Sequence, residues 1–353
     1  MNRLILLASL VSLLGATVSA KEDTTPARFT VQFVTVEKDV KLEVVDWGGS
    51  GRPVVLLAAL GADAHIYTDF APKLSGKYHV YGITRRGFGA SSVPVTGYSA
   101  DRLGDDVLAV IDALKLNRPV LVGHSMAGEE LSSVGSRHPE KVAALIYLDA
   151  AEAYAFYDPA EGDLQIDSLD LRKKIDHLIA HDSNPHPLIA ELLQSLPRYE
   201  NDLRETQKLL QSMEPRQDPN QPAPEGPKAE PPPPVPEEPK AESKQPVPEA
   251  PKPGRAMLAG EQRYTSVKTP VLAIFPSPHA EVAEMFEKDP VGRAAAEAAD
   301  VARVEARIKV VEKAAPAPHI VRIAHASHMV FMSNEADVLR EIEAFLGSLP
   351  GTP

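Results

Sequence analysis

The chain has 353 residues, of which 43% are hydrophobic and 24% charged, and its formal net charge is −12. This composition is ordinary for a globular protein and leaves room for one large α/β domain with additions. The negative charge argues against nucleic acid or an anionic membrane surface as the main partner, and the absence of cysteine excludes disulfides, thiolate metal sites and a cysteine nucleophile.

The first twenty residues have the pattern of a secretion signal. Arg3 is the positive start, residues 4–14 are an apolar core too short to span a bilayer comfortably, and residues 18–20 are small, as before a cleavage site. A buried N-terminal helix and an uncleaved anchor are the alternatives. We expect residues 1–20 to be a signal peptide, the protein to be secreted or periplasmic, and the mature chain to have no integral membrane span.

Hydrophobic patterns then predict strands that alternate with helices. Residues 29–34 and 40–45 alternate apolar and polar side chains, as half-exposed strands of a hairpin do. Continuous apolar runs at 53–57, 119–122 and 142–148 predict buried parallel strands, and further strands are expected at 78–83, 271–275 and 320–323. Helical spacing covers residues 103–116. This order predicts an α/β fold with a mostly parallel, doubly wound, eight-stranded sheet in residues 28–150 and 268–348.

The alternation breaks in the middle of the chain. Residues 151–213 have helical patterns, and an insertion at the carboxyl ends of the strands is expected to form a lid over the site. Residues 214–255 then contain fifteen of the 33 prolines. Proline blocks helix and sheet, and the segment lacks the apolar surface that would offset the entropy of ordering. We interpret it as a proline-rich disordered loop; a docking segment for a proline-recognising or cell-envelope partner is the alternative.

The most informative motif is Gly-His-Ser-Met-Ala-Gly at residues 123–128, between an apolar strand and a helical segment. It has the form of a nucleophile elbow, in which small residues permit a sharp turn and the serine hydroxyl leaves the sheet edge. The strict pattern is G-x-S-x-G, whereas Ala127 stands at the fifth position and Gly128 follows it. A serine hydroxyl is a poor nucleophile unless a base takes its proton, so the motif calls for a histidine and an acid.

These motifs resemble those of the α/β-hydrolase fold superfamily. Residues 85–91, Arg-Arg-Gly-Phe-Gly-Ala-Ser, resemble the R-G-x-G-x-S segment of that family, and residues 326–331, Ala-Ser-His-Met-Val-Phe, resemble its histidine loop. The resemblance implies a serine hydrolase with Ser125 as nucleophile and His328 as general base, acting on a small molecule without cofactor or metal. His325 is the alternative base.

The acid departs from the family pattern. The family's usual acid follows the strand at 271–275 by about four positions, but residues 276–281 read Pro-Ser-Pro-His-Ala-Glu, without aspartate. Some related enzymes place the acid after the preceding strand instead, where Asp149 stands at the same sheet edge as the serine. Asp149 is therefore the expected acid and Glu281 the main alternative. The further alternatives are Glu152, Asp158 or no acid at all.

An oxyanion hole needs two backbone N–H groups aimed at the developing charge. The residue after the nucleophile, Met126, is expected to supply one. Alignment of Ala-Ala-Leu-Gly at 58–61 with the corresponding family loop assigns the other to Leu60. Glu129 and Glu130 lie in the first turn of the helix that follows, where carboxylates complement the helix dipole.

The sequence thus predicts an exported serine hydrolase that cleaves a carboxylic ester, or a lactone, of a small and partly apolar substrate through an acyl-enzyme. A serine at the elbow argues against epoxide hydrolase or dehalogenase chemistry, which uses an aspartate there in this fold. The alternative is a binding or scaffolding protein that works through its pocket or its proline-rich loop. The missing acid after 271–275 favours that alternative, and the motif context of Ser125 and His328 disfavours it.

Overall fold

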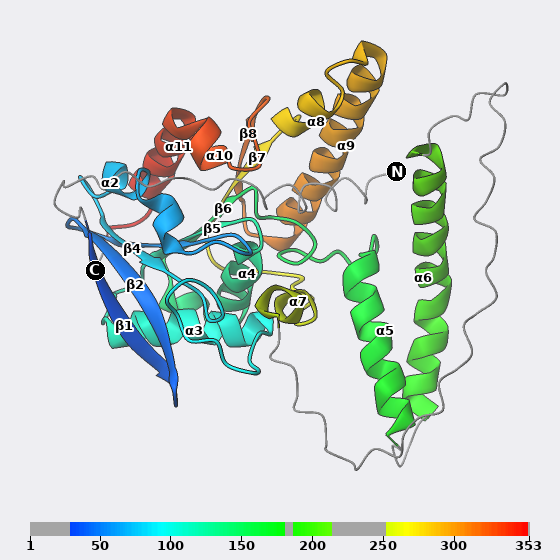
Figure 1. Cartoon of the computed structure of the whole chain (residues 1–353), viewed down its shortest axis with the longest axis horizontal. Coiled ribbons are helices and arrows are strands. Elements are labelled where there is room, and N and C mark those ends of the chain that lie inside the picture. Colours follow the sequence, from blue (N-terminus) through cyan, green and yellow to red (C-terminus); the bar gives the residue numbers. More distant parts are fainter. Residues whose placement is uncertain (1–28, 181–185, 214–251, 352–353) are drawn as a thin grey trace, which may run out of the picture.

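The computed structural model describes residues 29–180, 186–213 and 252–351 of the chain (Figure 1). The predicted signal peptide at 1–20 and residues 214–251 of the predicted proline-rich loop lie outside these ranges. In the described ranges, no helix is both long enough and apolar enough to cross a membrane.

The predicted proline-rich loop extends too far toward the C-terminus. The composition predicts a loop that ends at residue 255, whereas α7 (Pro253–Leu258) begins at Pro253. Proline suits the first helical position, because no intrahelical N–H donor is needed there. Met257 of this helix is fully buried against Tyr98 and Leu103. The chain therefore rejoins the core earlier than the predicted boundary at 268.

An eight-stranded sheet runs through the described residues in the order β1-β2-β4-β3-β5-β6-β7-β8. The β1–β2 and β2–β4 pairs are antiparallel and the later pairs are parallel, which confirms the predicted mostly parallel, doubly wound sheet. The strands are β1 (Thr30–Glu37), β2 (Val40–Gly48), β3 (Pro53–Leu57), β4 (His79–Ile83), β5 (Val120–His124), β6 (Ala144–Leu148), β7 (Val271–Pro276) and β8 (His319–Ile323).

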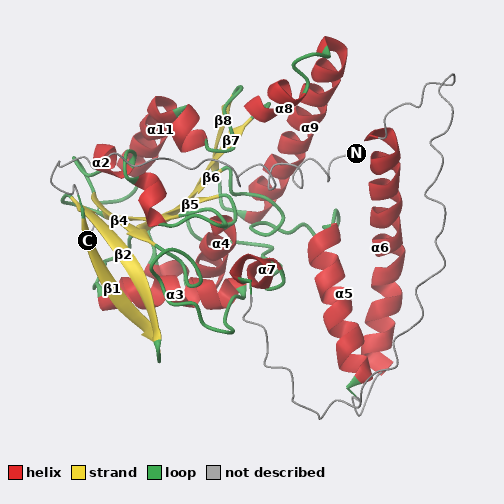
Figure 2. Cartoon of the chain, viewed as in Figure 1, coloured by secondary structure: helices red, strands yellow, loops and turns green. Residues whose placement is uncertain are grey.

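Helices cover both faces of the sheet (Figure 2). One apolar cluster joins the sheet to α3, α4 and α9, and the other joins it to η1, α2 and α11. Every residue of β5, β6 and β7 is buried as a result, which explains their continuous apolar sequences. The helices not yet given bounds are η1 (Ala64–Tyr67), α2 (Ala71–Leu74), α3 (Ala100–Ala113), α4 (Ala127–Arg137), η2 (Pro139–Lys141), α5 (Leu164–Ile179), α6 (His186–Met213), α8 (Ala280–Met285), α9 (Pro290–Ala314), α10 (Val330–Ser333) and α11 (Glu335–Ser348).

Local capping signals explain where several helices begin. The Ser99 hydroxyl accepts from the backbone N–H of Arg102 at the start of α3, and the Asp289 carboxylate accepts from Gly292 at the start of α9. The sequence analysis assigns no element to the segment that contains α8 and α9, although α9 is 25 residues long. This helix supplies several of the buried charges described below.

The predicted lid region contains α5 and α6, which lie side by side beyond the sheet edge (Figure 1). Asp163 caps α5 through the backbone N–H groups of Gln165 and Ile166. The Gln165 amide also donates to Glu261 at 2.8 Å, which ties the start of α5 to the segment after α7. That this helix pair serves as a lid stays a prediction.

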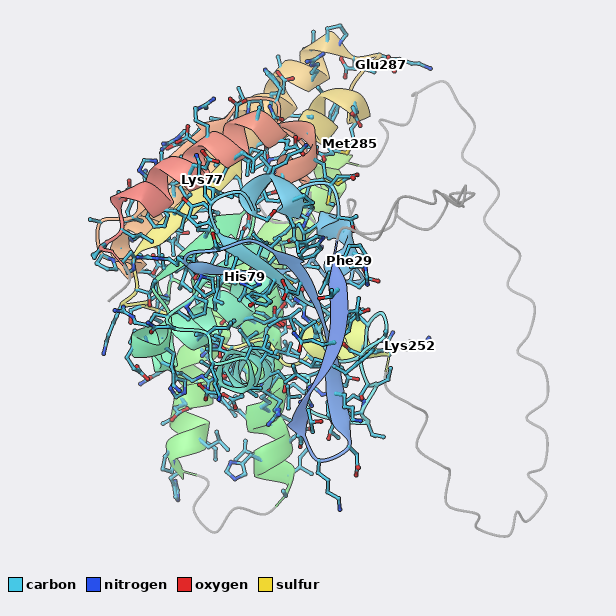
Figure 3. The ribbon with its side chains drawn as sticks, turned by 90° about the vertical axis from the view of Figure 1, so that its left-hand side faces the viewer. Phe29, Lys77, His79, Lys252, Met285 and Glu287 are labelled. Atoms are coloured by element: carbon cyan, nitrogen blue, oxygen red, sulfur yellow. The ribbon has the colours of Figure 1, made fainter. Side chains whose placement is uncertain are left out.

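The described chain begins with a residue that is anchored by packing. The ring of Phe29, labelled in Figure 3, lies 6.2 Å from the ring of Trp47 and 5.4 Å from that of His65, both edge-on. Such aromatic pairs fix the start of β1 against the second apolar cluster.

Candidate active site

Ser125 lies at the sharp turn between β5 and α4, at the carboxyl end of the parallel strands. Its φ is +54°, a left-handed conformation that residues other than glycine rarely adopt. Such strain is tolerated where the surrounding structure fixes it, and it is found often at functional sites. The turn projects the hydroxyl from the sheet edge, as the elbow motif predicts.

Close packing around the turn explains why the motif departs from the strict pattern. A Cβ on Gly128 would lie 1.8 Å from the carbonyl oxygen of Ala150, so that position admits only glycine. A Cβ on Gly123 would lie 2.6 Å from Leu131 and 3.1 Å from the Cβ of Ala127. Ala127 itself is fully buried without conflict. The steric demand for glycine therefore falls at residue 128 and not at 127.

The structure brings Ser125, His328 and Asp149 together. The His328 Nε2 atom lies 3.0 Å from Ser125 Oγ, and His328 Nδ1 lies 2.6 Å from Asp149 Oδ2. His328 stands in the loop between β8 and α10, and Asp149 directly follows β6, the neighbour of the serine's strand. With the proton on Nδ1, the ring donates to the carboxylate and can accept from the serine hydroxyl, which is the arrangement of nucleophile, base and orienting acid.

The alternative acids and the alternative base have other contacts. Glu281 Oε1 accepts the backbone N–H of His328 at 2.8 Å, so it holds the loop and not the imidazole. Glu152 pairs with Arg303 at 2.6 Å, and Asp158 pairs with Lys313 at 3.0 Å. His325 is exposed.

The ionisation of the pair follows from its contacts. Burial lowers the pKa of His328, but the hydrogen bond and the charge of Asp149 outweigh this and raise the pKa above its ordinary value. Burial alone would raise the pKa of Asp149. The charge and hydrogen bond of His279, with the hydrogen bond of His328, hold that pKa well below its usual range. Asp149 is therefore a carboxylate throughout the neutral range.

Two histidines in contact with this group were not assigned a role from the sequence. His279 Nε2 lies 3.1 Å from Asp149 Oδ2 and is discussed further below. The buried ring of His124 places Nε2 2.8 Å from the backbone oxygen of His328, to which Nε2–H donates. Burial lowers the pKa of His124 to about 3, so the ring is neutral. It ties the His328 loop to the residue before Ser125.

The role of the two predicted oxyanion donors stays a prediction, and the structure gives their places in the fold. Met126 stands at the N-terminal cap of α4, and Leu60 lies in the loop after β3. In the part of the chain that the structure describes, neither backbone N–H has an acceptor. Both groups are thus available to a ligand's oxygen.

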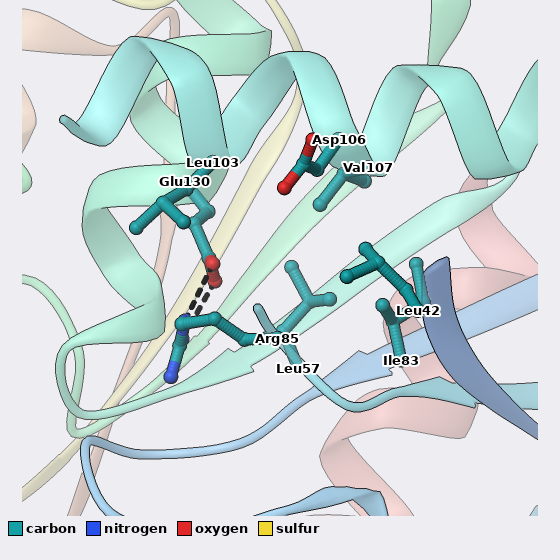
Figure 4. Close-up of a pocket in the computed structure, with 8 residues that line it drawn as sticks. All are labelled: Leu42, Leu57, Ile83, Arg85, Leu103, Asp106, Val107 and Glu130. Atoms are coloured by element: carbon teal, nitrogen blue, oxygen red, sulfur yellow. Dashed lines mark hydrogen bonds and ion pairs between the residues drawn. The ribbon is translucent and has the colours of Figure 1, made fainter. Parts of the chain in front are cut away.

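A buried ion pair holds the loop that carries Leu60 (Figure 4). Arg85 donates to both carboxylate oxygens of Glu130, at 2.7 and 2.8 Å, and to the carbonyl oxygens of Ala58 and Ala59, at 2.9 and 3.2 Å. Both charged side chains are buried. Glu130 therefore does more than complement the helix dipole, and the sequence-based explanation for it was incomplete.

Glu129, the neighbour of Glu130, has a different environment. Its side chain is fully buried, and neither carboxylate oxygen has a hydrogen-bond partner in the described residues. Burial and the charge of Glu130 raise its pKa well above the ordinary value. Glu129 lies in the first turn of α4, as the sequence predicts, but its burial disfavours the charged form that would complement the helix dipole.

Comparisons with known proteins agree on the fold. The sequence model of the alpha/beta hydrolase fold matches residues 52–219. The 3-oxoadipate enol-lactonase 2 of Acinetobacter baylyi is 31% identical over 115 residues, which are 32% of this chain and 43% of that protein. The fluoroacetate dehalogenase of a Burkholderia species is 30% identical over 119 residues, 32% of this chain and 39% of that protein.

A solved structure extends the likeness to most of the chain. The thermophilic esterase from Thermogutta terrifontis superposes with a TM-score of 0.51 at 18% identity, covering 90% of this chain and 98% of that chain. Likeness at this identity shows the fold alone. The chain spans about two fifths of the length of the curated relatives it matches. Because one fold hosts different reactions, the residues of the site must carry any functional argument.

Proposed function

The chain belongs to the α/β-hydrolase fold superfamily, and from this premise we propose that it is a serine hydrolase that cleaves a carboxylic ester or a lactone. One observation carries the proposal: the chain of contacts from Ser125 Oγ to His328 at 3.0 Å and from His328 to Asp149 at 2.6 Å. The names of the lactonase and esterase relatives agree with ester-bond chemistry. Cysteine is absent and the elbow residue is serine, so the nucleophile is a hydroxyl.

In the first half-reaction, Ser125 Oγ attacks the carbonyl carbon while His328 Nε2 takes the hydroxyl proton. The carbonyl electron pair moves onto oxygen, where the backbone N–H groups of Met126 and Leu60 stabilise the negative charge. The tetrahedral intermediate collapses, the bond to the leaving oxygen breaks, and His328 gives that oxygen its proton. An acyl-enzyme on Ser125 remains.

In the second half-reaction, His328 takes a proton from water, and the hydroxide attacks the acyl carbon. Collapse of this intermediate returns the proton to Ser125 Oγ and releases the carboxylic acid. Asp149 stays ionised throughout and stabilises the imidazolium that forms in each half. Because His328 must be neutral to accept a proton, the rate falls on the acid side of its raised pKa.

A serine at the elbow also separates this chain from its dehalogenase relative in expected chemistry. Displacement of halide from carbon requires a nucleophile whose ester with the alkyl group can then be hydrolysed, which a carboxylate provides and an alkoxide does not. We therefore propose acyl transfer to water for this chain, with a small and partly apolar substrate.

Export to the periplasm or the medium is part of the proposal. It rests on the pattern of Arg3, the short apolar core at 4–14 and the small residues at 18–20. The composition of residues 214–251 supports a spacer there, with a cell-envelope partner as the alternative.

The direct test is labelling of the purified protein with a fluorophosphonate probe, which reacts with activated serines. We expect the wild type to label, whereas the variants Ser125→Ala and His328→Ala remain unlabelled. A panel of p-nitrophenyl esters of increasing acyl length, together with simple lactones, then defines the substrate class.

Circular dichroism should accompany the labelling, so that a folded protein is compared in every case. A folded wild type that does not label would contradict the hydrolase proposal and favour the binding or scaffolding alternative. Labelling that persists in Ser125→Ala would place the reactive group elsewhere.

A further inference from the structure

The segment after β7 contains an unusual exchange of residue types. In the family that this chain resembles, the acid usually stands about four positions after the equivalent strand. At that place this chain has His279, three residues after Pro276, the last residue of β7. The acid stands instead after β6, as Asp149. The two side chains nevertheless meet, since His279 Nε2 lies 3.1 Å from Asp149 Oδ2.

Both ring nitrogens of His279 face carboxylate oxygens. Nε2 faces Asp149, and Nδ1 lies 2.8 Å from Oδ2 of Asp300 on α9. The backbone N–H of His279 donates to that same Asp300 oxygen at 2.8 Å. A carboxylate oxygen only accepts, so each ring nitrogen must carry a proton to make these contacts. The geometry is that of an imidazolium between two carboxylates.

The three side chains of this arrangement are largely buried. The side chains of Asp149, His279 and Asp300 are 7%, 11% and 1% exposed. Buried charges of this kind are costly unless each is paired. Arg303 donates to Asp300 at 2.9 Å and to Glu152 at 2.6 Å. Negatively and positively charged side chains therefore alternate along the chain of contacts that begins at Asp149.

Among the described residues, the charged groups around His279 come from three parts of the fold. Asp149 comes from the end of β6, Asp300 and Arg303 come from α9, and His328 comes from the loop after β8. Burial lowers the pKa of His279, but the two carboxylates outweigh it and raise the pKa to about 10. Asp300 has its pKa lowered to about 2 by the same contact, despite its burial.

We propose that His279 is a positioning residue, which as an imidazolium holds Asp149 against His328 in place of the aspartate absent after β7. This inference rests on the proposed function, because it assigns His279 a part in orienting the general base. Asp149 Oδ2 accepts from His328 and His279 together, so the carboxylate is held by two rings from two different loops. A carboxylate with its rotation fixed in this way keeps the imidazole in one tautomer and orientation.

The imidazolium has a second consequence for the base. Its positive charge lowers the pKa of His328, against the rise that Asp149 produces. The base therefore stays neutral at a lower pH than it would beside an unaccompanied carboxylate. Removal of His279 would thus act twice, by loosening Asp149 and by raising the pKa of His328.

The test is a histidine titration by ¹⁵N NMR in the full chain, with His279→Gln compared with the wild type. In the wild type, both ring nitrogens of His279 should be protonated at pH 8. In His279→Gln, the pKa of His328 should rise by about 0.5–1 unit, because a nearby positive charge is gone. The labelling rate with the fluorophosphonate should fall by about 10- to 100-fold. The acid limb of the pH profile, where the rate falls because His328 is protonated, should move to higher pH by as much as the pKa of His328 rises.

His319→Gln is the matched control. His319 is exposed at the start of β8 and pairs with Glu341 at 3.7 Å. The substitution therefore removes a contact between a histidine and a carboxylate at the other end of the strand from the His328 loop. It should leave the pKa of His328 and the acid limb unchanged. Asp300→Asn is the second variant if His279→Gln does not fold, and it should lower the pKa of His279 itself.

The outcomes separate this inference from the proposed function. A neutral His279 at pH 8, or an unchanged pKa of His328 in His279→Gln, would overturn the positioning role whether or not the protein labels. An unlabelled wild type with the predicted titrations would refute the hydrolase proposal and leave the contact between His279 and Asp149 established. A lower labelling rate without a shifted limb would reduce His279 to a structural residue.

Discussion

The turn that carries Ser125 and the turn that carries His279 stand on strands of the same sheet, yet they are constrained differently. At the serine, the backbone itself imposes residue types, since Gly128 packs against a carbonyl oxygen and Ser125 needs a left-handed φ. After β7, the demand is only that a carboxylate reach the imidazole. Asp149 reaches the imidazole from the end of the neighbouring strand, β6. The position after β7 is then free to hold another residue type, and His279 stands there. Steric demands fix a motif, whereas electrostatic demands can be met from several positions.

The largest effect should come from the acid itself. Asp149→Asn keeps the shape of the side chain but removes the charge that sets the tautomer of His328. We expect kcat/KM for a p-nitrophenyl ester to fall on the order of 10,000-fold, as when a triad acid becomes an amide. Glu281→Gln keeps an oxygen acceptor for the His328 backbone N–H and removes a charge near His328, and it should cost far less. Equal losses in the two variants would contradict the assignment of Asp149.

The steric half of the comparison can be tested at two adjacent positions. Gly128→Ala places a Cβ 1.8 Å from the Ala150 oxygen, and we expect a loss of about 3 kcal/mol in the free energy of unfolding. Ala127→Gly removes a buried methyl group at a helix start, and it should cost about 1 kcal/mol. Urea denaturation of both variants measures the difference. Similar values would show that the demand for glycine is not specific to residue 128.

The smallest effect distinguishes the two adjacent carboxyls of α4. The raised pKa of Glu129 means that the folded state keeps a proton which the unfolded state loses, so stability decreases as the pH rises above about 4.3. Glu129→Gln removes this decrease. Its free energy of unfolding relative to the wild type should therefore grow as the pH is raised from 5 to 8, which urea denaturation at the two pH values measures.

Glu130→Gln is the control for that experiment. It leaves the Arg85 guanidinium buried without its charged partner, so the variant should be destabilised by about 3 kcal/mol at pH 8. If Glu129→Gln were destabilised by a similar amount, Glu129 would have a partner that the described contacts do not include.

Much of the fold and site could be predicted because the relevant signals are local. Continuous apolar runs identified the central strands, which are buried on both faces. Small residues around Ser125 identified the elbow, since they follow from the backbone of a single turn. The position of Asp149 followed from adjacency, because neighbouring parallel strands end at the same edge of the sheet. The functions of these residues remain proposals.

The long-range contacts could not be predicted in this way. The sequence shows only that the segment with His279 lacks an aspartate. A titratable ring at the position of the missing acid was the signal that could have indicated a role for His279. Its partner Asp300 lies on α9, 21 positions further along the chain, in a segment to which no element was assigned. The contact of Met257 with the core could not be predicted either, because the short helix that carries Met257 has too few residues to show a clear periodicity.

The order of the strands along the chain, the elbow and the residue types that could serve Ser125 follow from the amino-acid sequence, because periodicity and steric size are properties of neighbouring residues. The environment of each carboxyl depends instead on how distant segments pack. Glu129 and Glu130 are adjacent, yet Glu129 is buried with no hydrogen-bond partner in the described ranges, whereas Glu130 is paired with Arg85. The same holds for His279, whose charge depends on two carboxylates from two other elements. Ionisation depends on burial and on the distance to other charges, and both are settled only when distant segments pack together.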